Sequence, residues 1–275
     1  MKIKNLIDYY SQELGGYSSY ALTEVEEIFL SALGLEQRSA LYLNDFQDIP
    51  FEVLDSAIEK RKQGYPLQYL TGRVNFFGFD FITKEGVFIP RPETELLVEY
   101  VVSNFKAVRG LKIVEVGTGS GIISICLTKL LADCKIIATD ISIQAIGLAS
   151  ANALLNGCRD EILFIKGDKT EFLHREGYFD LLVSNPPYIA LSEKHRLPKD
   201  VKKEPHQALF GGSCGYEFSL DLIRSGSKLI KPGGSIIIEI DQKHKSVYEK
   251  SFSGIARIDF IKDIHGLDRV MALKF

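Results

Sequence analysis

The residues Asn185-Pro186-Pro187-Tyr188 combine polar acceptors with a rigid backbone. Successive prolines remove backbone donors, so neighbouring carbonyl groups face outward as acceptors for a ligand that carries N–H groups. The Asn185 side-chain oxygen and the Pro186 carbonyl could accept both hydrogens of a planar amide or amine. This would raise the electron density on its nitrogen and align it with an activated methyl group. Tyr188 could stack on the planar group. The alternative for the whole motif is that it forms only a turn and binds no ligand.

A glycine-rich segment lies where a predicted strand turns into a helix that begins near Ile122. Glycines allow a tight turn and a close approach of the backbone to a ligand, and a helix N-terminus exposes free N–H groups. We therefore expect a nucleoside cofactor here, either S-adenosylmethionine or NAD, although such a turn can also serve packing alone. The candidate cofactor-binding residues of the segment are Glu115, Gly117, Thr118, Gly119 and Gly121.

Two aspartates follow later predicted strands and extend this candidate site. Asp140 ends a strand 19 residues after Gly121, where its carboxylate could accept hydrogen bonds from both ribose hydroxyls. The alternative for Asp140 is an N-cap of the next helix, a role that Ser142 could fill instead. Asp168 follows another strand and could accept a hydrogen bond from an adenine amine, or be a solvated loop residue. NAD chemistry does not call for the acceptor pair at Asn185, which favours S-adenosylmethionine.

The elements that must position these residues alternate between short apolar strands and helical segments. Near-continuous apolar runs separated by helices indicate a mostly parallel sheet covered on both faces, and so a doubly wound α/β domain. The predicted strands are Lys112–Val116, Lys135–Asp140, Ile162–Lys166, Phe179–Ser184, Ser235–Ile240 and Arg269–Lys274.

The N-terminal part of the chain has a different texture. Residues 3–62 show apolar positions at helical spacing, which predicts a small helical domain. Between Leu67 and Ile89, aromatic and β-branched residues alternate with glycines, which indicates a β-hairpin. The predicted organisation is a helical domain at residues 1–66, a β-hairpin linker at 67–88 and an α/β domain at 89–275.

Composition narrows the possible classes of protein. The net charge of −3, from 33 basic and 36 acidic residues, lacks the overall positive charge of a nucleic-acid binder. No apolar run reaches the roughly 20 residues of a membrane-spanning helix, and neither a signal peptide nor C-x-x-C cysteine pairs are evident. The histidines lack the spacing of a metal site. We expect a metal-free, cytoplasmic protein.

Several motifs together resemble the PrmC/HemK family, which methylates the side-chain nitrogen N5 of a glutamine in peptide chain release factors. The resemblance extends along the whole chain and is most specific after Gly64. The motifs that carry it are Gly64-Tyr65-Pro66-Leu67-Gln68-Tyr69-Leu70-Thr71-Gly72, Phe88-Ile89-Pro90-Arg91-Pro92-Glu93-Thr94-Glu95, Gly117-Thr118-Gly119-Ser120-Gly121, Ser184-Asn185-Pro186-Pro187-Tyr188-Ile189, and Glu204-Pro205 followed by Ala208-Leu209-Phe210-Gly211-Gly212.

The resemblance implies a seven-stranded class I S-adenosylmethionine-dependent methyltransferase domain and an N-terminal helical domain that docks the release factor. The acceptor would be the glutamine of a Gly-Gly-Gln loop, and S-adenosylhomocysteine would be the second product. Asn185 would also contact the cofactor. The implied catalytic residues are Asn185, Pro186 and Tyr188. The implied substrate-binding residues are Asn185, Pro186, Pro187, Tyr188, Arg91 and Thr94.

Some alternatives stay open at this stage. Arg91 could instead form a salt bridge with Glu93 or Glu95, and Thr94 could cap the helix that follows it. Two departures from the family pattern, Cys214 and the segment Glu239-Ile240-Asp241-Gln242, concern loop detail. An adenine N6-methyltransferase acting on nucleic acid, or a non-catalytic cofactor-binding regulator, are the rival functions. We expect a monomer with no direct nucleic-acid partner.

Overall fold

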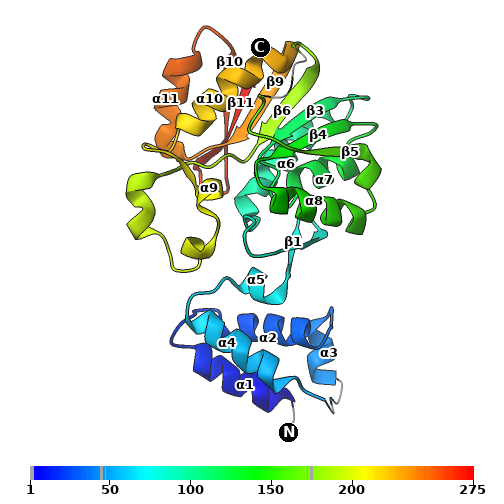
Figure 1. The fold of residues 1–275 in the computed structure, drawn as a ribbon, viewed down its shortest axis with the longest axis vertical. Helices are drawn as coiled ribbons and strands as arrows, with labels where there is room; N and C mark the ends of the chain where they lie inside the picture. The colour runs from blue at the N-terminus through cyan, green and yellow to red at the C-terminus, as the bar shows by residue number, and fades with distance from the viewer. Residues whose placement is uncertain (1–2, 44–45, 47, 172, 174–175) are drawn as a thin grey trace. The chain divides into compact units, whose positions relative to one another are not determined.

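The computed structural model describes residues 3–43, 46, 48–171, 173 and 176–275. The described residues form two compact units (Figure 1). One unit contains the residues up to Arg73 together with Leu197–Lys203, and the other contains Val74–Arg196 and Glu204–Phe275.

The N-terminal unit is helical. Its helices are α1 (Ile3–Leu14), α2 (Ala21–Ala32), α3 (Arg38–Leu43), α4 (Phe51–Lys62) and α5 (Leu67–Thr71), with the 3-10 turn η4 (Val201–Lys203). Helix α1 buries Ile3, Leu6, Ile7, Tyr10 and Leu14, whose spacing makes one apolar stripe along the helix. These side chains pack against buried residues of α2, α3 and α4 in a single core.

A short hairpin follows this unit, but it occupies only part of the range predicted for it. Leu67–Thr71 form helix α5, which ends at Gly72 in the left-handed conformation. Strands β1 (Arg73–Phe76) and β2 (Phe79–Ile82) then pair. Phe77 and Gly78, which connect the two strands, each have a positive φ angle. This conformation suits a tight turn between twisted strands.

The C-terminal unit is built on a seven-stranded sheet with the order β10-β11-β9-β6-β3-β4-β5. Strands β9, β6, β3, β4 and β5 run parallel to one another, and β11 is antiparallel to both β9 and β10. The doubly wound α/β prediction is confirmed. The strand bounds are β3 (Lys112–Val116), β4 (Lys135–Asp140), β5 (Ile162–Lys166), β6 (Phe179–Ser184), β9 (Ile230–Glu239), β10 (Arg257–Lys262) and β11 (Asp268–Lys274).

Other elements of this unit connect or cover the strands. The helices are α6 (Glu95–Phe105), α7 (Ile122–Leu130), α8 (Ile143–Leu155), α9 (His206–Leu209), α10 (Glu217–Gly226) and α11 (Lys245–Phe252). Two short strands, β7 (Ile189–Ala190) and β8 (Phe210–Gly212), pair with each other. The 3-10 turns are η1 (Pro92–Thr94), η2 (Arg159–Glu161), η3 (Leu191–Arg196), η5 (Ser227–Leu229) and η6 (Gln242–His244).

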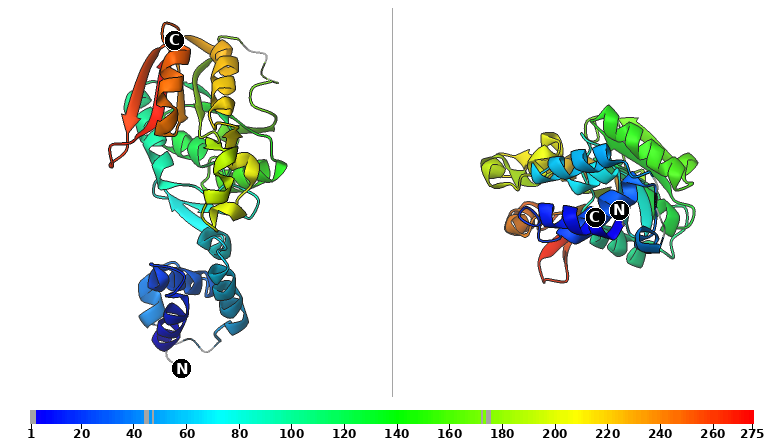
Figure 2. Two further views of the ribbon diagram at one scale, coloured as in Figure 1. Left: turned by 90° about the vertical axis from the view of Figure 1, so that its left-hand side faces the viewer. Right: turned by 90° about the horizontal axis from the view of Figure 1, so that it is seen from below.

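Helices cover both faces of the sheet. Because side chains alternate along a strand, Ile113 and Ile237 lie in a core with α6, α7 and α8. Val114 and Ile236, one position away on the same strands, lie in a second core with α10 and α11. Figures 1 and 2 both show α11 and β10, drawn in orange to red, at one edge of the sheet.

Strand β10 was missed by the sequence prediction, and β9 begins five residues before the predicted Ser235, at Ile230. Most residues of β10 are only half buried, as is usual for an edge strand, so its pattern lacks the continuous apolar run that marks the inner strands.

Among the described residues, no helix is long and apolar enough to cross a membrane. The same residues contain no cluster of three or more histidine, cysteine or acidic side chains arranged to hold a metal ion.

Substitution Ile237→Ala tests the central packing of the sheet. Ile237 is fully buried, so the loss of its side chain should lower the free energy of unfolding by about 2–5 kcal/mol. Urea unfolding followed by circular dichroism measures this change. The matched control is Ile264→Ala, because Ile264 is 95% exposed and its loss should cost less than about 0.5 kcal/mol. Equal effects from the two substitutions would contradict the described core.

Candidate active site

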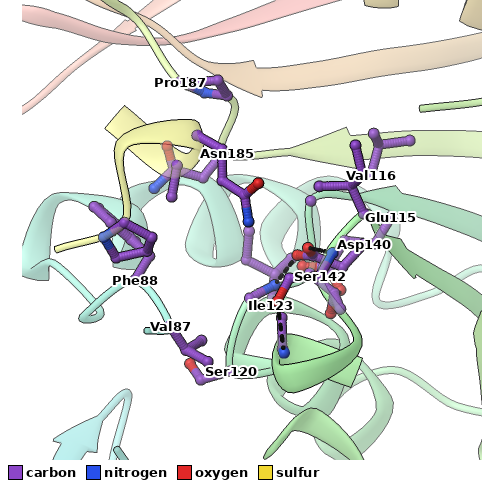
Figure 3. A pocket seen from close by; sticks show the side chains of 18 of the residues that line it. Val87, Phe88, Glu115, Val116, Ser120, Ile123, Asp140, Ser142, Asn185 and Pro187 are labelled. Atoms are coloured by element: carbon purple, nitrogen blue, oxygen red, sulfur yellow. Dashed lines mark hydrogen bonds between the residues drawn. The ribbon is translucent and has the colours of Figure 1, made fainter. Parts of the chain in front are cut away.

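A cavity of about 440 Å³ lies where β3, β4 and β6 end. Open α/β sheets place their ligands at these carboxyl ends. Figure 3 shows Asn185 and Pro187 on one side of the pocket, Glu115, Asp140 and Ser142 on another, and Val87 and Phe88 on a third. The predicted site residues that line it are Glu115, Gly117, Thr118, Gly119, Asp140, Asp168, Asn185 and Pro187.

The glycine-rich turn after β3 has the conformation that its sequence requires. Gly117, Gly119 and Gly121 all have positive φ, which side chains other than glycine rarely adopt. Gly117 and Gly119 line the pocket. Gly121 is not among the lining residues; it precedes α7, and a Cβ atom there would lie 3.0 Å from the Cβ of Ala149. Its role is therefore close packing between α7 and α8.

Asp140 is oriented by backbone donors. Its Oδ2 accepts a hydrogen bond of 2.9 Å from the Gly119 N–H, and its Oδ1 accepts one of 2.9 Å from the Ser142 N–H. Burial raises the pKa of this carboxyl, opposed by the backbone hydrogen bonds. The Ser142 hydroxyl accepts from the Ala145 N–H and caps α8. Asp140 is thus not the cap, and each of its oxygens keeps a lone pair for a ribose hydroxyl.

Glu115 has the features expected of a residue that binds a cationic donor. Its side chain is fully buried, and its Oε2 accepts hydrogen bonds from Thr118, at 2.7 Å, and from Ser124. Its Oε1 has no partner among the described residues, and burial raises its pKa to about 7. The methionine part of S-adenosylmethionine carries an ammonium group, which fits this buried acceptor.

Apolar and aromatic residues form the rest of the wall, and reasoning from single motifs missed them as site residues. They include Phe88, Ile141, Phe210 and Phe218. Such side chains suit the flat adenine ring of a nucleoside. One signal in the sequence could have identified two of them: Phe88 and Phe210 lie within the motifs that carry the family resemblance, although outside the glycine-rich loop.

The Asn185 side chain is held by a chain of hydrogen bonds. Its Nδ2 donates to the Thr94 hydroxyl at 2.9 Å, and that hydroxyl donates to Glu239 Oε2 at 2.6 Å. The Tyr188 hydroxyl donates to Glu239 Oε1 at 3.3 Å. Thr94 and Tyr188 are thus linked to Asn185 at the pocket, but neither of them, nor Pro186, is among the lining residues.

The structure corrects both alternatives for the segment before α6. Thr94 precedes that helix, but its side chain makes no capping hydrogen bond because its hydroxyl serves Glu239 and Asn185. Arg91 pairs with Glu204 rather than with Glu93 or Glu95, and it does not line the pocket.

Glu204 supports the pocket wall from behind. Besides pairing with Arg91, it accepts a hydrogen bond of 3.0 Å from the Ile89 N–H. The Arg91 guanidinium lies 5.2 Å from the centre of the Phe88 ring. Because Phe88 and Pro90 line the cavity on either side of Ile89, one buried carboxylate holds this wall in place.

Substitution Glu115→Gln tests the buried carboxyl by its effect on stability. The folded-state pKa of about 7 exceeds the ordinary value of 4.5, so between these values the folded state binds a proton that the unfolded state lacks. The free energy of unfolding should therefore fall as the pH rises through this window, by up to about 1.4 kcal/mol per pH unit for one proton.

In the cofactor-free protein, Glu115→Gln should make this fall shallower, as measured by urea unfolding between about pH 5 and about pH 7. The exposed Glu99→Gln is the matched control and should keep the wild-type slope. The buried-charge assignment is wrong if Glu115→Gln and wild type have the same slope.

Comparisons with known proteins agree on the family. A model described as the methyltransferase small domain matches residues 78–212, and one described as the PrmC N-terminal domain matches residues 5–72. The release factor glutamine methyltransferase of Dictyoglomus turgidum is 37% identical, covering 89% of this chain and 88% of that protein. The protein of the same name from Clostridium acetobutylicum is 35% identical over 98% of both chains.

Solved structures show the same fold. A ribosomal protein L11 methylase from Lactobacillus delbrueckii subsp. bulgaricus matches with a TM-score of 0.50 and 26% identity, covering 70% of this chain and 81% of that chain. A methyltransferase from Pyrococcus furiosus matches with a TM-score of 0.52 and 18% identity, covering 72% of this chain and 89% of that chain, and this likeness concerns the fold alone. The seven-stranded unit has the class I methyltransferase fold, and the chain belongs to the release factor glutamine methyltransferase family.

Proposed function

We propose that this protein transfers the methyl group of S-adenosylmethionine to the side-chain nitrogen N5 of the glutamine in the Gly-Gly-Gln motif of peptide chain release factors. The match of nearly the whole chain to release factor glutamine methyltransferases carries the proposal. It is supported by the position of Asn185 at a pocket whose other side offers Glu115 and Asp140. S-adenosylhomocysteine is the second product, and the amide nitrogen releases one of its two protons to solvent once the methyl group has arrived.

The chain's own residues position and polarise the acceptor. S-adenosylmethionine, when bound, supplies a methyl group activated by its sulfonium. An amide nitrogen is a poor nucleophile because its lone pair is delocalised into the carbonyl. The Asn185 Oδ1 and the Pro186 carbonyl accept its two hydrogens, which increases electron density on the nitrogen and holds it for transfer. Tyr188 packs beside the amide, and Pro187 shapes the pocket.

The remaining roles follow from the same proposal. Glu115, Gly117, Thr118, Gly119 and Asp140 hold the cofactor, with Asp168 at its adenine. Gly121 acts indirectly by allowing α7 to pack closely against α8. Neither Arg91 nor Thr94 lines the pocket. They act on the acceptor side indirectly, Arg91 through its ion pair with Glu204 and Thr94 through its hydrogen bond with Asn185.

The helical domain docks the release factor. Support comes from the PrmC N-terminal domain match and from aromatic side chains exposed on this unit. Exposed aromatic residues are enriched at protein interfaces; here they are Tyr9, Tyr17, Tyr20, Tyr42 and Phe51. The proposal includes a cytoplasmic monomer without a direct nucleic-acid partner, in keeping with a substrate from the translation machinery and the net charge of −3.

The proposal predicts label transfer from radiolabelled S-adenosylmethionine to an intact bacterial release factor. A factor whose Gly-Gly-Gln glutamine is replaced by alanine should stay unlabelled, as should total RNA and DNA. Scintillation counting of the separated components measures the transfer. Label on nucleic acid instead would favour adenine N6 methylation and sink the release-factor proposal.

Substitution Asn185→Ala should lower kcat/KM for the release factor by about a hundredfold or more, because one acceptor of the polarised amide is lost. Calorimetry should show S-adenosylmethionine binding retained, which separates loss of turnover from loss of cofactor. The matched control Asn104→Ala, at an exposed position of α6, should keep wild-type kinetics. A non-catalytic cofactor-binding regulator would show no transfer in any of these variants.

A further inference from the structure

We infer that Glu239 is a positioning residue that acts through the Thr94 hydroxyl to keep the Asn185 side-chain oxygen turned toward the acceptor nitrogen. This inference deepens the proposed function and rests on it for the identity of the acceptor. Thr94 and Glu239 are 0% and 2% exposed. Water therefore cannot easily replace the hydrogen bonds between them, and their donor and acceptor roles depend on each other.

The direction of the hydrogen bonds follows from the number of available protons. An ionised carboxylate only accepts, so the single proton of the Thr94 hydroxyl goes to Glu239. The Thr94 oxygen can then only accept from the other side, and it must take its hydrogen from Asn185 Nδ2. Because an amide carries its oxygen and nitrogen on opposite sides, Asn185 Oδ1 is left for the acceptor.

Protonation of Glu239 reverses this direction. Because Glu239 Oε1 accepts from the Tyr188 hydroxyl, the added proton lies on Oε2. Oε2 then donates to Thr94, and the Thr94 hydroxyl donates to Asn185. The amide must turn to present its oxygen to Thr94, which aims its NH₂ group at the N–H groups of the acceptor. Two facing donors repel, so the amide acceptor site is lost while the fold is kept. Glu239 thus sets the polarity of a site that it does not touch.

The groups around Glu239 set where this reversal occurs. Burial is the largest cause that raises the pKa of Glu239, and the nearby charge of Glu93 in η1 raises it further. The hydrogen bonds from Thr94 and Tyr188 and the charge of Arg269 on β11 lower it. The resulting pKa is about 7. Burial and the charge of Glu239 raise the pKa of the Tyr188 hydroxyl, so Tyr188 remains a neutral donor. Glu95, at the start of α6, accepts from the Phe77 N–H instead.

The first test follows the side-chain NH₂ of Asn185 by NMR in the ¹⁵N-labelled full chain without cofactor or substrate, assigned by its absence in Asn185→Ala. Its resonance should shift as the pH is lowered from about 8 to about 6. The shift should be absent in Glu239→Gln, which cannot titrate. It should also be absent in Thr94→Val, which keeps Glu239 but breaks the chain of hydrogen bonds.

These variants separate the relay from a direct electrostatic effect. A pH-dependent shift that persists in Thr94→Val would show that Asn185 senses the Glu239 charge without the hydroxyl, and would overturn the inference. The absence of any shift in the wild-type protein would overturn it as well. Thr94→Ser keeps the hydroxyl and should keep the shift, which guards against a general loss of structure.

The second test measures the pH profile of release factor methylation. In the wild-type protein, kcat/KM for the release factor, measured with S-adenosylmethionine saturating at every pH so that Glu115 stays engaged with the cofactor, should fall about tenfold per pH unit below the Glu239 titration. This acid limb should disappear in Glu239→Gln and persist in Thr94→Ser and in the exposed control Glu249→Gln. Thr94→Val should lower kcat/KM at least about tenfold with S-adenosylmethionine affinity unchanged.

An acid limb that survives in Glu239→Gln would overturn the inference. If the wild-type protein binds S-adenosylmethionine but transfers no methyl group to the release factor, the proposed function fails. The NMR test then still decides whether Glu239 controls Asn185, because it needs neither substrate nor turnover.

Discussion

The parallel pairing of β3 with β4 and β6 is the constraint on which the site depends. Parallel strands end at the same edge of a sheet, so residues that follow each strand meet there although they lie far apart in the chain. Asp140 and Asn185 reach one cavity for this reason. The parallel strands at the centre of the sheet are covered by helices on both faces, as such strands usually are; Ile113 and Val114, adjacent on β3, pack into opposite cores.

Buried carboxylates give this edge its chemical character. Glu115, Glu239 and Glu204 are each almost fully shielded from solvent, and a buried charge is costly unless it is hydrogen-bonded. Each is held by donors from other elements: Glu115 by Thr118 and Ser124, Glu239 by Thr94 and Tyr188, and Glu204 by Arg91 and the Ile89 N–H. The pKa values of Glu115 and Glu239 are raised because burial at this site disfavours the charged form of each carboxyl.

Local patterns predicted much of this structure. The bounds of β3 and β6 and the start of α7 agree with the apolar runs and the glycine turn, because these elements are specified by neighbouring residues. The half-buried edge strand β10 was missed because its sequence lacks a continuous apolar run; its pairing with β11, rather than a local pattern, makes it a strand. Likewise, α5 was overlooked within a segment rich in β-forming residues, where Pro66 and Gly72 bound a single helical turn.

The contacts that orient the candidate site could not be predicted from spacing. Thr94 and Glu239 are 145 positions apart, and Arg91 and Glu204 are 113 apart. No local periodicity links such pairs; only the folded sheet brings them together. This is why the alternatives considered for these residues, a helix cap for Thr94 and a salt bridge with Glu93 or Glu95 for Arg91, involved only sequence neighbours. Ser142, which caps the helix directly after it, was recognised as a candidate because that contact is local.

The most direct measurement of the central claim is tandem mass spectrometry of a release factor after incubation with this protein and S-adenosylmethionine. The account predicts one added methyl group, located on the side-chain nitrogen of the glutamine in the Gly-Gly-Gln motif. A methyl group on the peptide backbone or on another side chain would contradict the assignment of Asn185 and Pro186 as the acceptors that hold a glutamine amide.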